Sequence, residues 1–165
     1  MDESLINKRW IEELAQQPEK YEIHELYKVY PDEKIDVAKE QKLIESYDKI
    51  IFQFPFYWYS SPPLLKKWID EVLLYGWAYG SKSGHKVGGK KIALAITVGG
   101  NEEGYSPSGE YGYSMKELTT PFDKTFDYIK ADYKGLFAYY GIEFNTSEEW
   151  IERSVPKYLD FIEKI

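Results

Sequence analysis

The sequence of 165 residues contains no cysteine, so it forms no disulfide, no thiolate metal site and no redox-active thiol. Any electron transfer must therefore depend on a bound cofactor. No apolar run approaches the roughly 20 residues that a membrane-spanning helix needs. The N-terminal residues also lack the apolar core of a signal peptide. We therefore expect a cytoplasmic protein with no membrane insertion.

Positive charge and histidine are also scarce. The 21 Lys and Arg residues are outnumbered by 28 Asp and Glu residues, which disfavours binding of nucleic acid through a basic surface. His24 and His85 are isolated in sequence, and we expect each to be an ordinary surface or strand residue and not a ligand or base. No His, Asp and Glu residues cluster at the spacing of metal ligands, so no metal site is predicted.

Apolar and aromatic residues are abundant, at 43% and 18% of the chain, and 16 residues are tyrosine. This composition is typical of a folded globular protein, and the length suits one domain, residues 1–165, with a sizeable core. We find no internal repeat and no low-complexity tract.

The hydrophobic pattern predicts strands that alternate with helices. The expected strands are 21–27, 49–54, 91–98 and 133–140. The expected helices are 4–17, 37–47, 64–74, 115–129, which Pro121 interrupts early, and 147–165, which Pro156 bends; Ser4, Asp36 and Ser147 are the expected N-caps. Right-handed crossovers would assemble these elements into a parallel α/β sheet with helices on both faces.

The stretch from Phe54 to Gly80 carries the main functional signal. A buried strand ends at Pro55, and four aromatic residues follow before a helix with one apolar face: Phe56, Tyr57, Trp58 and Tyr59. In an open α/β sheet, loops at the carboxyl ends of strands build the ligand site. These rings would suit a flat, conjugated ligand there, although composition alone also fits core or interface aromatics.

Two later Gly-rich loops lead to different predictions about function. The long Gly-rich loop after the strand at 91–98 again follows a strand's carboxyl end, which favours a functional role. The Gly- and Ser-rich loop at 80–89 lacks the Gly-Lys-Ser/Thr ending of a phosphate loop and precedes a strand, so it predicts a mobile surface loop.

The segment FPFYWYSSPPLLKKWIDEV, followed by GWAYG, closely resembles the signature of the flavodoxin-like NAD(P)H:quinone oxidoreductases. Within them it is similar to the bacterial branch of general-stress and drug-activity-modulator quinone reductases and of ancillary subunits of glutathione-gated potassium efflux. The resemblance implies a flavodoxin-like three-layer sandwich with a parallel sheet of strand order 2-1-3-4-5.

The resemblance also implies a function. A two-electron reduction of small quinones or similar electrophiles is expected in a stress response, with FMN or FAD as cofactor, FMN being favoured, and NADH or NADPH as co-substrate. A homodimer is implied, with the ring-rich residues 73–79 at its interface. The competing interpretation is that the monomer's own loops bury Trp77 and Tyr79. The alternative is a regulatory ancillary subunit that binds a potassium-efflux transporter.

The resemblance places the site residues as well. Flavin contacts fall on Ser4 and Asn7 at the phosphate and on the remaining positions along the ribityl chain and ring: Phe56, Tyr57, Trp58, Tyr59, Thr97, Val98, Gly99 and Gly100. Tyr105 falls where the family closes over the nicotinamide or quinone, although an exposed loop tyrosine is an equal interpretation. Tyr113 is a weaker candidate.

One part of the family pattern has no match. Members begin with an apolar strand and a His-Pro pair before a Ser-x-x-Asn motif, and only the motif is present, as Ser4-Leu5-Ile6-Asn7. Strand 1 is therefore expected to be missing or incomplete. Either Met1 is an internal methionine taken as the start, or the shortened chain is natural and its sheet has rearranged. We expect these 165 residues to bind flavin far more weakly than a chain with the missing strand restored, down to an empty site, because the phosphate would lose backbone donors.

Overall fold

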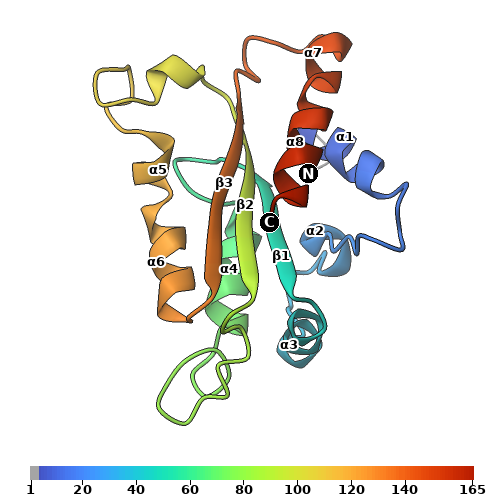
Figure 1. The fold of residues 1–165 in the computed structure, drawn as a ribbon, viewed down its shortest axis with the longest axis vertical. Helices are drawn as coiled ribbons and strands as arrows, with labels where there is room; N and C mark the ends of the chain where they lie inside the picture. The colour runs from blue at the N-terminus through green and yellow to red at the C-terminus, as the bar shows by residue number, and fades with distance from the viewer. Residues whose placement is uncertain (1–3) are drawn as a thin grey trace.

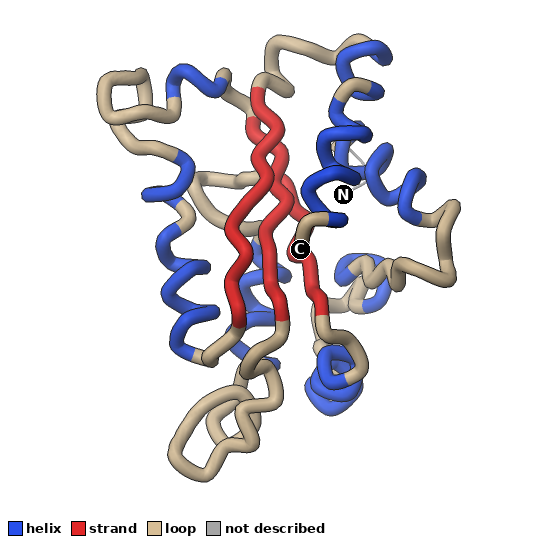
Figure 2. Tube along the Cα trace, viewed as in Figure 1, coloured by secondary structure: helices blue, strands red, loops and turns tan. Residues whose placement is uncertain are grey.

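The computed structural model describes residues 4–165; residues 1–3, on which the expectation about Met1 depends, lie outside the described residues. A parallel sheet of order β1-β2-β3 lies at the centre, formed by β1 (Lys49–Pro55), β2 (Lys91–Val98) and β3 (Asp132–Tyr140). Helices cover both of its faces (Figure 1, Figure 2). The expected α/β fold of three layers is confirmed.

The helices follow the predicted order with shifted bounds. They are α1 (Leu5–Leu14), α2 (Leu26–Val29), α3 (Val37–Glu45), α4 (Pro63–Val72), α5 (Met115–Leu118), α6 (Thr120–Tyr128), α7 (Glu148–Glu152) and α8 (Ser154–Glu163), with a 3₁₀ turn η1 (Glu102–Gly104). In the described part of the chain, none of them is both long and apolar enough to cross a membrane.

Two buried clusters hold the layers together. On one face of the sheet, Trp10 of α1 stacks on Tyr158 of α8 with ring centroids 4.4 Å apart. On the other face, Leu94 and Ile96 of β2 pack with α4 and α6, and Phe52 stacks on Phe126 at 5.6 Å. Residues of β2 are almost wholly buried because both of its faces are covered.

The predicted strand at 21–27 is wrong. Residues 21–25 have no strand pairing, and α2 begins at Leu26. An alternating pattern becomes a strand only when a neighbour completes its backbone hydrogen bonds. No strand pairs with the outer edge of β1 within residues 4–165, so the described sheet has three of the five strands that the implied order requires.

A buried carboxylate anchors residues 21–30 instead. Glu40 of α3 is 1% exposed and accepts hydrogen bonds from Tyr30 Oη at 2.5 Å and Trp68 Nε1 at 2.7 Å. His24 Nε2 lies 2.9 Å from Glu40 Oε1. This network fastens the segment to α3 and α4.

Prolines divide two of the predicted helices. The helix expected at 115–129 breaks at Thr119 into α5 and α6, and the one expected at 147–165 breaks at Arg153 into α7 and α8. Pro121 and Pro156 each remove one backbone donor shortly after the break. The caps at Asp36 and Ser147 are confirmed, since each side chain accepts a backbone N–H bond. Ser4 occupies the N-cap position of α1 without such a bond.

Candidate functional site

Three loops meet at the carboxyl ends of the strands, the upper end of the sheet in Figure 1. We call residues 55–62, 99–114 and 141–147 the strand-end loops. Sheet-like pairing carries on into them, because Phe56 N donates to Thr97 O at 2.9 Å and Gly141 N donates to Gly100 O at 2.9 Å. Each loop therefore begins in a fixed register with its neighbour.

The structure joins three of the predicted site residues from distant parts of the chain. Asn7 Nδ2 donates to Thr97 Oγ1 at 2.7 Å and to Ser4 Oγ at 2.9 Å. Asn7 and Thr97 are buried, and Asn7 Oδ1 has no hydrogen-bond partner among the described residues. Within residues 4–165 no side chain caps α1, and the N–H groups of its first turn have no intrahelical partner. This helix end can bind an anionic group such as a phosphate.

Gln53 was missed by the sequence analysis, although it holds this helix end in place. Its Nε2 donates to Asn7 O at 3.1 Å, and its Oε1 accepts from Tyr158 Oη at 2.8 Å. A polar residue inside an otherwise apolar strand was the available signal, because a buried amide needs partners.

Trp58 and Tyr59 form a tight turn at the end of β1. Tyr57 N donates to Ser60 O at 2.9 Å and Ser60 N donates to Tyr57 O at 2.8 Å. The two central residues have φ of 48° and 60°, a region that bulky side chains rarely occupy. Trp58 is 94% exposed, and Tyr57 and Tyr59 are about half exposed. Backbone strain is thus accepted to present rings to solvent, a feature that clusters at functional sites.

Rings from two of the strand-end loops, 55–62 and 99–114, and from β3 form one cluster. Tyr105 packs on Tyr111 with centroids 4.4 Å apart and on Tyr140 at 5.5 Å. Tyr59 connects this pair to the first loop, at 6.4 Å from Tyr111 and 6.5 Å from Phe56. The predicted residues Phe56, Tyr59 and Tyr105 therefore come together, while the exposed Tyr113 has no ring contact in the described structure. Tyr111 and Tyr140 were missed.

Two side chains pack closely over Gly99 and Gly100. A Cβ on Gly99 would lie 2.4 Å from Glu143 Oε1, and one on Gly100 would lie 2.5 Å from Tyr111 Oη. These side chains cover one side of the glycines and leave the main chain as the group that a ligand could contact. Val98 is 1% exposed, so it too can offer only its main chain. Neither Glu143 nor Tyr111 had a sequence signal of its own.

Burial alters the acidity of Tyr105. Removal from water, together with the nearby Tyr111, Tyr59 and Glu143, raises the pKa of Tyr105 to about 12. Its hydroxyl therefore stays protonated at neutral pH and can donate a hydrogen bond. Within residues 4–165 no group of His, Asp and Glu side chains is arranged to hold a metal ion.

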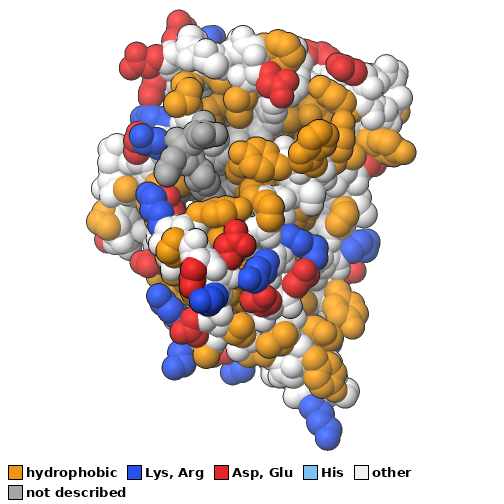
Figure 3. All heavy atoms as spheres, turned by 180° about the vertical axis from the view of Figure 1, so that it is seen from behind, with side chains coloured by type: hydrophobic (Ala, Val, Ile, Leu, Met, Phe, Trp, Pro, Cys, Tyr) orange, Lys and Arg blue, Asp and Glu red, His pale blue; other side chains and the backbone are white. Residues whose placement is uncertain are grey.

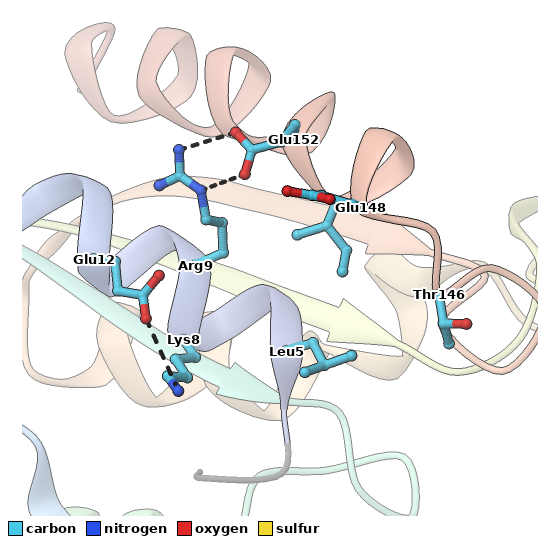
Figure 4. Close-up of a pocket in the computed structure, with 8 residues that line it drawn as sticks. Leu5, Lys8, Arg9, Glu12, Thr146, Glu148 and Glu152 are labelled. Carbon is cyan, nitrogen blue, oxygen red and sulfur yellow. Dashed lines mark hydrogen bonds and ion pairs between the residues drawn. The ribbon is translucent and has the colours of Figure 1, made fainter.

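A groove of about 460 Å³ lies on the outer side of α1 against α7 (Figure 4). It is lined by Leu5, Lys8, Arg9, Glu12, Thr146, Glu148, Ile151 and Glu152. Arg9 binds Glu152 through two bonds of 2.5 and 3.0 Å, and Lys8 lies 4.0 Å from Glu12. The cations of the groove are thus already paired, and the pair of Arg9 with Glu152 fastens α1 to α7.

The profile of the flavodoxin-like fold family matches residues 1–162. The chain belongs to this family. Among flavodoxin-like relatives, general stress protein 14 of Bacillus subtilis is 46% identical over 164 residues, which cover 99% of this chain and 92% of that protein. The uncharacterised NAD(P)H oxidoreductase YrkL of Bacillus subtilis is 42% identical over 162 residues, which cover 98% of this chain and 91% of that protein.

A solved flavodoxin-like structure carries the cofactor. The crystal structure of general stress protein 14 from Treponema denticola, in complex with FMN, matches with a TM-score of 0.92 and 44% identity over 99% of this chain and 92% of that one. An NADPH-quinone reductase from P. pentosaceus matches with a TM-score of 0.73 and 26% identity over 81% of this chain and 77% of that one. The resemblance seen in residues 54–80 is confirmed by these relatives.

Proposed function

We propose that this chain is an FMN-dependent NAD(P)H oxidoreductase that reduces small quinones or similar electrophiles by two electrons. One observation carries the proposal: the uncapped start of α1, joined to β2 through Asn7 and Thr97, lies at the same end of the sheet as a cluster of exposed and half-buried rings. An anion-binding helix end beside an aromatic wall suits a phosphorylated, flat cofactor. The FMN named in the complex of the Treponema relative supports the same choice.

The residues of the site fit FMN in two parts. The first turn of α1 and Ser4 would hold the phosphate, with Asn7 and Thr97 fixing their position from the buried side. The rings of Phe56, Tyr57, Trp58 and Tyr59 would line the ribityl chain and the flavin, and the main chain of Val98, Gly99 and Gly100 would face its polar edge. When bound, the flavin supplies hydride acceptance from a nicotinamide and hydride donation to an acceptor.

Tyr105 is the residue to which we assign a catalytic role. Its hydroxyl is protonated at neutral pH and lies in the aromatic cluster above the strand ends. From there it would donate a hydrogen bond to the oxygen of an acceptor on which negative charge develops. The surrounding rings would exclude water from that oxygen.

The proposal is tested with purified protein reconstituted with FMN. Binding is followed by quenching of flavin fluorescence, and oxidation of NADH and NADPH is followed with and without an added quinone. At saturating FMN we expect the flavin to bind, although weakly because the described sheet lacks strand 1, and quinone to stimulate nucleotide oxidation. Failure to bind FMN, or no turnover with either nucleotide over a panel of quinones, refutes the proposal. Nothing in residues 4–165 favours the alternative of an ancillary subunit on a potassium-efflux transporter.

We further propose a cytoplasmic homodimer with an interface at the opposite end of the sheet. There Tyr79 lies 5.8 Å from Tyr75 and 5.3 Å from Tyr128, and Tyr75 and Tyr128 are 64% and 67% exposed. We call Leu74, Tyr75, Tyr79 and Tyr128 the tyrosine patch. Figure 3 shows the α4 side of the molecule, with hydrophobic side chains towards its lower end.

The tyrosine patch has a fixed shape although it is exposed. Tyr75 packs directly on Gly80, whose φ is 106° and where a Cβ would lie 2.4 Å from the Tyr75 ring. Trp77, expected at the interface as well, is partly buried against the monomer's own core, and its Nε1 donates to Glu45 Oε1 at 2.8 Å. Ordered, exposed tyrosines are typical of interface anchors.

A further inference from the structure

The strand-end loops carry negative charge and no positive charge. Residues 53–65 contain no charged side chain, residues 92–115 contain Glu102, Glu103 and Glu110, and residues 141–147 contain Glu143. No Lys or Arg occurs in these three stretches. The loops that surround the candidate site therefore contribute four carboxylates and no compensating cation.

These carboxylates act on the site itself. Glu143 lies across Gly99, with its Oε1 where a Cβ would approach to 2.4 Å. Burial raises the pKa of Tyr140 to about 12, and the charge of Glu102 adds to this rise. Burial also raises the pKa of Tyr111, helped by the charges of Glu110 and Glu143. Three of the four carboxylates thus act on tyrosines of the aromatic cluster, from two different loops.

The cations that flank these loops lie on helices, and Lys116, the second residue of α5, is exposed. Lys66 on α4 is 2.6 Å from Asp70, and Arg9 on α1 is bound to Glu152. None of the four carboxylates forms an ion pair within residues 4–165. The flanking positive charge therefore lies on α1, α4 and α5, while the strand-end loops themselves carry only negative charge.

We infer that the strand-end loops exclude anions, so that the site selects NADH over NADPH and uncharged acceptors over anionic ones. The inference rests on the proposed function and names the charge class of its reactants. NADPH differs from NADH by one phosphate, which sites usually recognise with Arg. A cleft lined by one sign of charge changes the local concentration of a charged reactant by roughly 10- to 1,000-fold.

The first test is the ionic-strength dependence of kcat/KM for NADH and NADPH with a neutral quinone. We expect NADH to be favoured by about 10-fold or more at about 0.01 M salt, where the Debye length is about 30 Å, and the preference to shrink several-fold at about 1 M, where it is about 3 Å. A parallel series compares 1,4-naphthoquinone with its 2-sulfonate. Because sulfonation also changes the quinone's potential, the salt dependence of that ratio is the measured quantity.

A matched pair of variants isolates the loop charges. Glu102→Gln/Glu110→Gln should lower the preference for NADH several-fold and flatten its salt dependence. The control, Glu19→Gln/Glu22→Gln, removes the same charge from exposed positions after α1 and should leave both unchanged. A preference for NADPH, or a salt dependence equal in the two variants, would overturn the inference.

A second readout needs no turnover. Trp58 is 94% exposed among these loops, so its fluorescence, taken as the difference between the native chain and Trp58→Phe, reports the local potential. Relative to free tryptophan amide, we expect caesium to quench it more than iodide, with neutral acrylamide as reference, and Glu102→Gln/Glu110→Gln to reduce that bias. Equal or stronger quenching by iodide overturns the inference even if the enzyme is active. If no nucleotide is oxidised, the proposed function fails while this measurement still decides the charge of the loops.

Discussion

The hydroxyl of Tyr105 is the smallest unit on which the proposed chemistry depends. Tyr105→Phe removes it and keeps the ring that packs on Tyr111. We expect kcat to fall by roughly 10- to 100-fold, within the usual range for loss of a positioned proton donor, with FMN affinity unchanged. Steady-state kinetics and flavin titration measure the two effects.

Acidity gives Tyr105 a second signature. Burial raises the pKa of Tyr105 to about 12, so its hydroxyl stays protonated and its titration should cause no loss of activity between about pH 6 and 9. Tyr113→Phe is the control, since this exposed tyrosine lies outside the aromatic cluster. Equal kcat in the Tyr105→Phe variant and the native protein would remove the assigned role.

Glu40 is the residue whose charge the fold itself requires. Burial alone would raise its pKa, but hydrogen bonds from His24, Tyr30 and Trp68 outweigh burial and hold the pKa below 4.5. A carboxylate with a lowered pKa stabilises the fold above its unfolded-state pKa, and this stability is lost as pH falls through the folded-state pKa. The free energy of unfolding should therefore drop below about pH 4.5.

Glu40→Gln tests this assignment. An amide cannot accept from all three donors, so we expect a loss of about 3 kcal/mol at pH 7, comparable to breaking a buried charged network. The variant should also lose less stability on acidification than the native chain. Urea unfolding at pH 7 and pH 4 measures both, with the exposed Glu19→Gln as control. An unchanged pH dependence in Glu40→Gln would contradict the account.

Single residues differ in how far the sequence predicted them. The link between Asn7 and Thr97 joins two positions that the family resemblance had already placed at one site. Tyr111 and Glu143 could not be predicted because their importance comes from contacts with Gly100 and Gly99, which only the folded loops create. Charge or ring type alone carries no information about such contacts.

At the scale of elements, the turn from Tyr57 to Ser60 holds Trp58 and Tyr59 at positive φ, which lowers the stability of the fold, and exposes both rings to solvent. Trp58→Asn/Tyr59→Gly supplies residues that accept positive φ, where a bulky side chain costs roughly 1–2 kcal/mol. We expect the free energy of unfolding to rise by about 1 kcal/mol, because the lost contacts of Tyr59 offset part of the gain. FMN affinity and kcat/KM should fall together as the ring wall is removed.

The control for this turn keeps the rings and the strain. Trp58→Phe/Tyr59→Phe should leave the free energy of unfolding within about 0.5 kcal/mol of the native value, as for most exposed substitutions. Urea unfolding of the three proteins measures the difference. A less stable Asn-Gly variant would mean that the turn is not strained.

The sequence pattern correctly predicted the strands that are covered on both faces, but it wrongly predicted a strand at 21–27. The apolar runs at 49–54 and 91–98 predict β1 and β2 within one residue, because burial on both faces leaves little else for them to be. The alternation at 21–27 is equally consistent with an extended segment whose His24 turns to a buried carboxylate. Choosing between them depends on what lies beside the segment, which its own residues do not encode.

At the scale of the whole molecule, we expect light scattering at micromolar concentration to give twice the mass of the chain. Tyr75→Glu/Tyr128→Glu places two charges in the tyrosine patch and should shift the protein to monomer, because desolvating unpaired carboxylates is unfavourable. Phe144→Glu, at a 65% exposed position outside the patch, should leave the dimer intact. A monomeric native protein, or an unaffected patch variant, would contradict the proposed interface.

The outer edge of β1 has a consequence for the time scale on which its amides exchange with solvent. Phe56 N donates to β2, so alternate amides before it, at Ile50, Phe52 and Phe54, face β2 as well. The backbone amides of Ile51 and Gln53 face the outer edge, away from β2. Pro55 also lies at an outward-facing position, so its missing N–H removes no hydrogen bond to β2. Deuterium uptake along this one strand should therefore alternate between slow and fast residues. Any chain that pairs with that edge would erase the alternation, so the exchange pattern of the six amides of β1 reports whether the sheet has been extended.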